Sequence, residues 1–186
     1  MKPELMAALA AALLLVLWIV VTHNRLVSLR QHLRESWSDI DVELKRRWEL
    51  IPNLVETVKG YAAYERETLD RLVALRGQAM AAPDNARAHG AAESALLMAL
   101  RQVFVMAEAY PTLKADAHYQ VLQKELAITE DRIAAARRFY NANVRDLNRM
   151  REQFPSSIVA AQMKVPPANY FELASEAERV VPRVEI

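Results

Sequence analysis

The N-terminal part of the chain carries a continuous hydrophobic pattern, which begins as an unbroken apolar run and continues as an apolar stripe at helical spacing. Residues 5–21 are 17 consecutive apolar residues, and from Leu26 onwards the apolar positions fall on a single stripe. The stripe consists of three triplets, each shifted by 11 residues from the one before: Leu26, Leu29 and Leu33; Trp37, Ile40 and Leu44; Trp48, Ile51 and Val55. Steps of three and four residues mark one face of a helix. The sequence therefore predicts a membrane helix that leads directly into a long amphipathic helix.

The apolar run is long enough to serve as a membrane anchor. At a rise of about 1.5 Å per residue it spans about 26 Å, close to the ~30 Å of a bilayer's hydrocarbon core. The alternative is a secretory signal peptide, but the bulky residues 19–24 do not form the small-residue cleavage site of such a peptide. The anchor is expected to expose these residues to lipid: Leu5, Leu9, Leu13, Leu17, Trp18 and Val21.

The charges that flank the run favour one orientation. Arg25, Arg30 and Arg34 follow it, whereas Lys2 before it is offset by Glu4. Basic residues collect on the cytoplasmic side of membrane helices. The soluble part is therefore predicted to be cytoplasmic, with the opposite side of the membrane as the alternative, and the protein to cross the membrane once.

The rest of the chain predicts an all-α fold. Apolar residues recur at helical spacing over residues 24–50, 52–82, 91–110 and 114–153. Pro52 either bends the first of these helices or begins the next, because proline disrupts a helix interior but is tolerated in a first turn. Residues 81–90 are rich in turn-forming residues and predict a loop. Residues 163–186 contain three prolines and predict an extended arm, with a turn of helix near residues 173–179.

These elements predict a single transmembrane helix that leads into an antiparallel bundle of three to four long helices, with an extended C-terminal tail. The expected division is a transmembrane anchor at residues 1–23, a helical bundle at 24–155 and a mostly extended arm at 156–186.

Composition excludes several classes of function. The formal net charge is +1 and the chain has no cysteine, so neither a basic nucleic-acid-binding surface nor a thiolate metal site is expected. The sequence has no HExxH metal motif and no glycine-rich phosphate-binding loop. We expect no cofactor, no bound metal, no catalytic residues and no enzymatic activity.

One polar stretch stands out beside the apolar stripe. On a helix, Asp41 would face Lys45, and Glu43 would face Arg46 and Arg47, which is typical of pairing on a helix surface. The following segment has more polar residues than a core requires. The sequence therefore predicts an exposed interaction face made of Asp41, Lys45, Arg46, Arg47, Asn53, Glu56 and Lys59.

The same stretch carries a family resemblance. The segments IDVELKRR at residues 40–47 and LIPNLVETVKGY at 50–61 closely resemble the signature of the bacterial LemA family, and YPTLK at 110–114 and YFE at 170–172 extend the similarity over nearly the whole chain. The resemblance implies a single-pass protein of the bacterial cytoplasmic (inner) membrane, so that the alternative location of the soluble part is the periplasm. It also implies a bundle of long helices and no catalytic residues. It also implies an association with membrane processes, because a relative takes part in forming magnetosome membranes and others are associated with membrane quality-control peptidases.

Two functional hypotheses follow. The first is a non-enzymatic membrane scaffold that forms a homo-oligomer and organises or remodels the bacterial membrane, with membrane lipid and further copies of itself as partners. The second is an adaptor that regulates a membrane quality-control peptidase and so binds other membrane proteins. No nucleic-acid partner is expected in either case.

Overall fold

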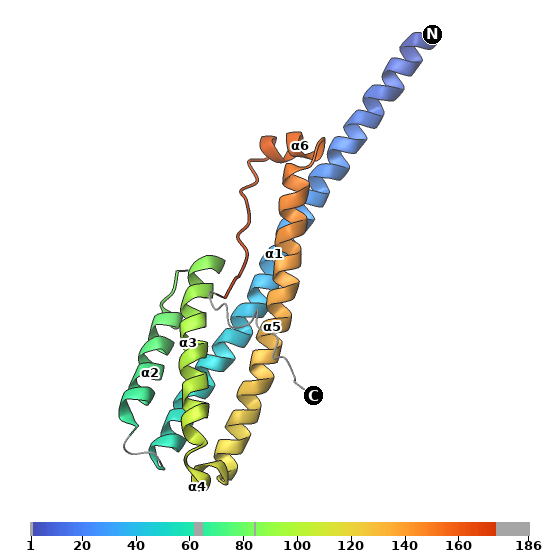
Figure 1. Ribbon diagram of the computed structural model, residues 1–186. Coiled ribbons are helices and arrows are strands. Elements are labelled where there is room, and N and C mark those ends of the chain that lie inside the picture. The colour runs from blue at the N-terminus through green and yellow to red at the C-terminus, as the bar shows by residue number, and fades with distance from the viewer. Residues whose placement is uncertain (1, 62–64, 84, 174–186) are drawn as a thin grey trace, which may run out of the picture. The chain divides into compact units, whose positions relative to one another are not determined.

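A computed structural model describes residues 2–61, 65–83 and 85–173, with Leu5 described by its backbone alone. Within these residues there are six helices and no strand, which confirms the predicted all-α fold with a long apolar N-terminal helix (Figure 1). The helices are α1 (Pro3–Lys59), α2 (Arg66–Met80), α3 (Ala86–Ala107), α4 (Pro111–Lys114), α5 (Ala117–Glu152) and α6 (Ser156–Gln162). The chain divides into two compact units, one of residues 1–39 and 138–168 and one of residues 40–137 and 169–186.

The first unit pairs the earlier part of α1 with the later part of α5. The two helices run antiparallel, because Trp37 stacks against Tyr140 with 5.4 Å between ring centroids, whereas Leu26 packs with Leu147. Val159 and Ala160 of α6 and Val165 complete this small apolar core. Asn148 fixes the segment after α6 because its side chain both donates to and accepts from the backbone of Ala168, at 2.9 Å each.

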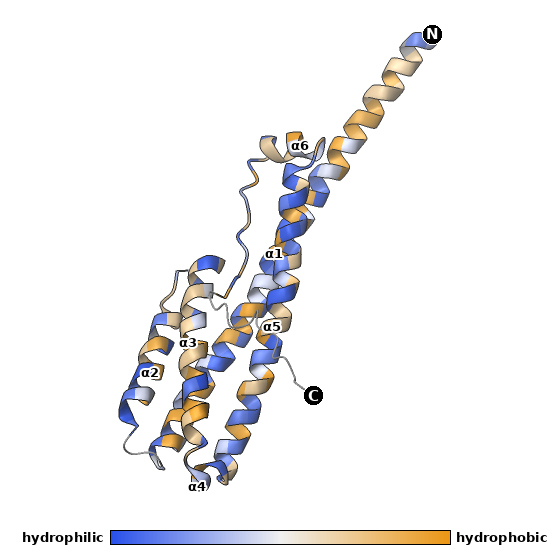
Figure 2. Ribbon diagram, in the orientation of Figure 1, coloured by the Kyte–Doolittle hydropathy of each residue, from blue (hydrophilic) through white to orange (hydrophobic). Residues whose placement is uncertain are grey.

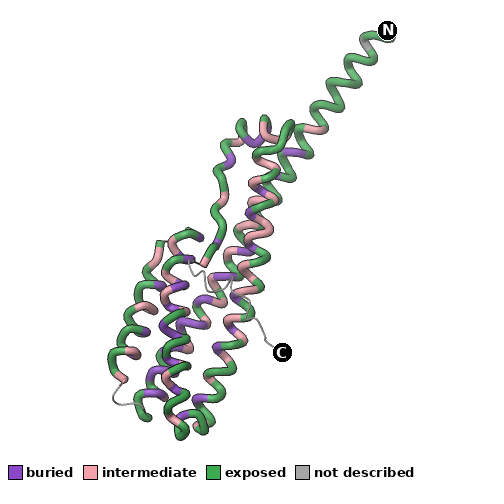
Figure 3. Tube along the Cα trace, viewed as in Figure 1, coloured by how far each residue is buried: buried purple, intermediate pink, exposed green. Residues whose placement is uncertain are grey.

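The described part of the second unit contains five helical segments, namely the end of α1, α2, α3, the short α4 and the first part of α5. α2 packs directly against α3. The core is aliphatic and draws on every long helix of the unit: Ile40, Leu44, Ile51, Leu54, Leu69, Leu72, Leu96, Leu100, Val103, Leu126 and Ile133. Figure 3 shows these buried positions along the facing sides of the helices.

The apolar stripe on α1 faces inwards, as predicted. Six of its nine residues are buried and the other three, Leu29, Leu33 and Trp37, are half-buried. The residues of the 11-residue repeat therefore form the inward face of α1, both in the part that belongs to the first unit and in the part that belongs to the second.

Of the two alternatives for Pro52, the structure excludes a helix that begins there: α1 passes through the proline and keeps its buried face. α1 is continuous to Lys59, and the break falls at Gly60. Proline cannot donate to the carbonyl four residues earlier, which here belongs to Trp48. The Nε of Arg76 on α2 donates to that carbonyl oxygen at 2.6 Å. A tertiary hydrogen bond thus replaces the one that Pro52 removes.

Two other boundaries differ from the sequence prediction. α3 begins at Ala86 rather than after Gly90, because the Asn85 side chain accepts a hydrogen bond from the Ala88 N–H at 2.9 Å and caps the helix. Residues 156–162 form α6, and residues 165–173 have no regular structure, as expected of an extended arm. The helical turn predicted near residues 173–179 lies almost wholly outside the described residues, and the division into anchor, bundle and arm stays a prediction.

Candidate functional site

The predicted anchor is an exposed apolar helix. Leu9, Leu13, Leu17 and Val21 are all exposed, and Trp18 is half-buried because it packs on the core of the first unit. Figure 2 shows this part of α1 as a nearly unbroken hydrophobic stretch. Of its most apolar 18-residue window, only 6% is buried. An exposed helix of this length and composition is compatible with a membrane anchor.

α3 also passes the test of length and apolar composition for a membrane span. Half of its apolar window is buried, however, and it carries core residues of the second unit. Its hydrophobicity is therefore explained by packing inside the bundle.

The predicted interaction face separates into an exposed part and a buried part. Asp41 and Lys45 pair at 2.6 Å along the helix, and this ion pair raises the pKa of the Lys45 ammonium. Asn53, Glu56 and Lys59 are exposed. Arg46 is half-buried, whereas Arg47 is only 2% exposed and so does not belong to an exposed face. The prediction of an exposed Arg47 was wrong.

Two charged residues of α1, Arg46 and Glu43, pair with α5 rather than along their own helix. Arg46 binds Glu125 of α5 at 2.6 Å, and Glu43 lies 3.7 Å from Arg132 of α5. The predicted pairing of Glu43 with Arg46 and Arg47 was therefore wrong. The physical reason is that this side of α1 faces α5, where acidic and basic partners are nearer than the next turn of α1.

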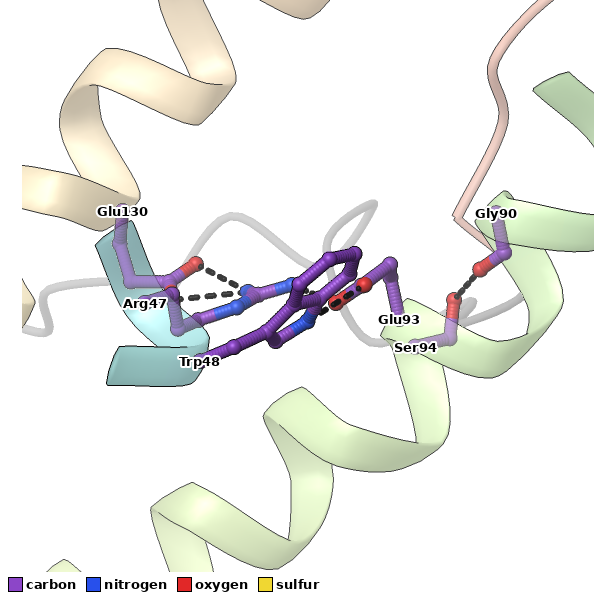
Figure 4. A network of polar contacts seen from close by, with 6 residues as sticks. All are labelled: Arg47, Trp48, Gly90, Glu93, Ser94 and Glu130. Carbon is purple, nitrogen blue, oxygen red and sulfur yellow. Dashed lines mark hydrogen bonds and ion pairs between the residues drawn. The ribbon is translucent and has the colours of Figure 1, made fainter. Parts of the chain in front are cut away.

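A buried polar network surrounds Arg47 in the core of the second unit (Figure 4). Its Nη1 donates to both carboxylate oxygens of Glu130 at 2.8 and 3.1 Å, and its Nη2 pairs with Glu93. The other oxygen of Glu93 accepts from the indole N–H of Trp48 at 3.0 Å. One guanidinium thus connects α1, α3 and α5.

The network holds one guanidinium between two carboxylates: Arg47 and Glu93 are buried, whereas the Glu130 side chain is 27% exposed. Burial raises the pKa of the Glu93 carboxyl, and the Arg47 guanidinium and the Trp48 N–H counteract part of that rise. Buried ion pairs add little net stability but impose a defined arrangement on the helices that carry them. The network is therefore suited to fixing the register of three helices.

Sequence reasoning did not identify Glu93 or Glu130. A usable signal was present, because Glu93 is the single aspartate, glutamate, lysine or arginine between Arg87 and Arg101. An isolated carboxylate within an apolar helix is almost never buried without a partner.

A groove adjoins the exposed part of the face. It has a volume of about 360 Å³ and is lined by Ile51, Pro52, Val55, Glu56, Lys59, Val73 and Arg76. Glu56 and Lys59 thus flank an apolar floor formed between the end of α1 and α2. Among the described residues no group of three metal-ligating side chains comes together.

An apolar N-terminal helix continuous with a bundle of long helices defines a class of helical-bundle proteins whose first helix is compatible with a membrane anchor. The model of the LemA family matches residues 36–186, so the chain belongs to the LemA family, as its sequence predicted. The LemA protein of Metamycoplasma hominis is 26% identical over 157 residues, which covers 84% of this chain and 71% of that protein.

Proposed function

We propose that the protein is a non-enzymatic scaffold of the bacterial cytoplasmic membrane that associates with copies of itself and organises or remodels the bilayer. The observation that carries this proposal is the continuity of α1, whose exposed apolar part extends without a break into the core helix of the bundle. A continuous helix couples the orientation of the bundle to that of the anchor, because no flexible linker separates the two.

The exposed face next to the groove supports self-association. It presents Glu56 and Lys59 beside the apolar floor of Ile51, Val55 and Val73. In a two-fold symmetric interface, Glu56 of one copy can pair with Lys59 of the other copy, and Lys59 of the first with Glu56 of the second. A face that carries one acidic and one basic residue is therefore complementary to itself.

The first test is the mass and shape of the full-length protein in mild detergent, measured by light scattering and electron microscopy. A regular homo-oligomer supports the scaffold, and a monomer overturns it. Glu56→Lys alone should weaken the assembly by like-charge repulsion, whereas the double exchange Glu56→Lys with Lys59→Glu should restore it. Lys124→Glu, at an exposed position of α5, is the matched control and should leave the mass unchanged.

The alternative is an adaptor for a membrane quality-control peptidase. The same groove favours it, because an apolar floor with flanking charges can hold an extended segment of another protein. Co-purification of a peptidase at fixed stoichiometry, lost in Val73→Asp, would support the adaptor. A homo-oligomer without a second protein would oppose it.

The proposed orientation places the bundle in the cytoplasm, on the basis of Arg25, Arg30 and Arg34 after the anchor. The chain has no cysteine, so a single cysteine at the exposed Val105 gives an unambiguous label. A membrane-impermeant maleimide applied to spheroplasts should fail to label Val105→Cys until the membrane is lysed. Labelling of intact spheroplasts would assign the bundle to the periplasm.

A further inference from the structure

The turn between α5 and α6 exposes two large apolar side chains. Phe154 is 78% exposed and Ile158 is 62% exposed. The backbone around them is well fixed, because the Ser156 hydroxyl is 2.7 Å from the Met150 carbonyl oxygen and the Ser157 N–H donates to the Gln153 carbonyl at 2.8 Å. We call Phe154, Ile158 and the residues between them the α5–α6 corner.

The corner lies at the level of the last turns of the apolar run of α1. Along the antiparallel pair, Trp37 lies beside Tyr140, and Leu26 packs in the same cluster as Leu147. α5 ends at Glu152, a few residues further in the same direction. Figure 1 shows α6 beside α1 just before the free N-terminal part of that helix.

Packing within the first unit also places the corner beside the last turns of the apolar run. Trp18, which lies inside the apolar run, packs on the cluster that contains Val159 and Ala160 of α6. The inner face of α6 thus touches the last turns of the anchor. Ile158 is on the outer face and points away from that cluster.

The first unit is also more basic than the whole chain. Residues 24–39 and 138–168 contain eight lysines and arginines but four aspartates and glutamates, whereas the net charge of the chain is +1. Arg149 and Lys164, on either side of the corner, are exposed. Basic side chains next to a bilayer are attracted to anionic lipid headgroups.

We propose that the α5–α6 corner is a second membrane contact, in which Phe154 and Ile158 enter the boundary between headgroups and acyl chains. This inference rests on the proposed membrane anchoring by α1. Aromatic and aliphatic side chains next to basic residues are typical of segments that lie in this boundary. The two contacts together would fix the tilt of the first unit against the bilayer, which a single helix cannot do.

Single-cysteine labelling of the full-length protein tests the proposal. Ile158→Cys and Phe154→Cys carry an environment-sensitive fluorophore, and the protein is reconstituted in vesicles of phosphatidylethanolamine and phosphatidylglycerol. Lipids with a nitroxide near the headgroup should quench both labels strongly. The control is Phe139→Cys, which replaces an aromatic residue that is also exposed in the same unit but lies 13 residues, or about 20 Å of helix, before the end of α5 at Glu152.

Leu13→Cys separates failure of this inference from failure of the anchor. Lipids with a nitroxide deep in the acyl chains should quench the Leu13 label. Quenching at Leu13 without quenching at the corner would overturn the second contact and leave the anchor intact. No quenching at Leu13 would overturn both the anchor and the second contact. If the headgroup nitroxide quenched the Phe139 label as strongly as the corner labels, the corner would not be a distinct membrane contact. A variant is included in the comparison only if its thermal melt, followed by circular dichroism, matches that of the unmodified protein.

Discussion

Arg46 and Arg47 are neighbours in the sequence but occupy different environments. The Arg46–Glu125 pair is more than a third exposed on both sides, so solvent screens it. Arg47 is 2% exposed and holds two carboxylates, from Glu93 and Glu130. The two residues thus offer a matched comparison of a screened and a buried ion pair on one helix turn.

We expect Arg47→Met to destabilise the protein by about 3–5 kcal/mol, because it leaves Glu93 buried without its cation. Arg46→Met should cost less than about 1 kcal/mol, as is usual for a partly exposed pair. Urea unfolding at pH 7 in detergent, followed by circular dichroism, measures both. Equal costs would contradict the buried network.

Asp116 caps the N-terminus of α5. Its carboxylate accepts hydrogen bonds from the Tyr119 N–H at 2.9 Å and the Tyr61 hydroxyl at 2.8 Å, and these bonds lower its pKa below the ordinary value of 3.8. A carboxyl with a lowered folded-state pKa stabilises the fold above its unfolded pKa and loses that contribution as the pH falls through the folded pKa.

Asp116→Ala should lower the melting temperature at pH 7, because the cap is lost. Asp116→Asn should keep most of the cap, since asparagine accepts the same hydrogen bonds. The melting temperature of the unmodified protein should exceed that of Asp116→Asn at pH 7, and the difference should shrink as the pH falls below about 4 and through the lowered pKa of Asp116. A difference that is independent of pH would show that the charge of Asp116 has no part in the cap.

At the scale of an element, α1 continues through Pro52 with the help of α2, because Arg76 donates to the carbonyl oxygen that Pro52 leaves without a donor. Arg76→Met should destabilise the protein by about 1.5–3 kcal/mol, because the Trp48 carbonyl loses a charged donor. In the Pro52→Ala background the same change should cost less, since the backbone N–H that alanine supplies at this position can bond to that carbonyl. A double-mutant cycle by urea unfolding gives the coupling energy. Additive costs would mean that Arg76 does not replace the missing bond.

The extended segment after α6 packs on α3 at Gly90. Phe171 is fully buried, and a Cβ at residue 90 would lie 2.2 Å from the Glu172 carbonyl oxygen. Gly90→Ala should therefore displace the segment and speed chymotrypsin cleavage at Phe171. Gly77→Ala is the control: its Cβ meets nothing within 4 Å, so it should stabilise α2 by about 0.5–1 kcal/mol without changing cleavage. Unchanged cleavage in Gly90→Ala would contradict this docking.

The sequence predicted what depends on local pattern and missed what depends on a distant partner. The stripe from Leu26 to Val55 identified the inner face of α1, because apolar spacing alone determines which side is buried. The sequence left open whether the helix passes through Pro52, since the answer depends on Arg76, which lies 28 residues from the Trp48 carbonyl along the chain. The burial of Arg47 was missed for the same reason, because its partners Glu93 and Glu130 lie on other helices.

At the scale of the whole molecule, the apolar run of α1 has two roles that overlap at Trp18. The side chains at residues 2–4 and 6–17 are exposed, whereas Trp18 packs on the core of the first unit and Thr22 is buried. The predicted anchor at residues 1–23 therefore includes the start of the folded unit. Cutting the chain on either side of Trp18 should have different consequences.

Removal of residues 1–16 should abolish binding to vesicles but leave the melting temperature of the bundle close to that of the full chain. Removal of residues 1–23 should lower the melting temperature as well, because the core around Leu26 loses the Trp18 side chain. The cost should stay below the ~3–5 kcal/mol of deleting a fully buried tryptophan, since Trp18 is half-buried. Vesicle flotation and circular dichroism melts measure the two effects separately. Equal melting temperatures in the two truncated proteins would make Trp18 part of the anchor alone, whereas a difference would place the boundary between anchor and bundle inside the apolar run.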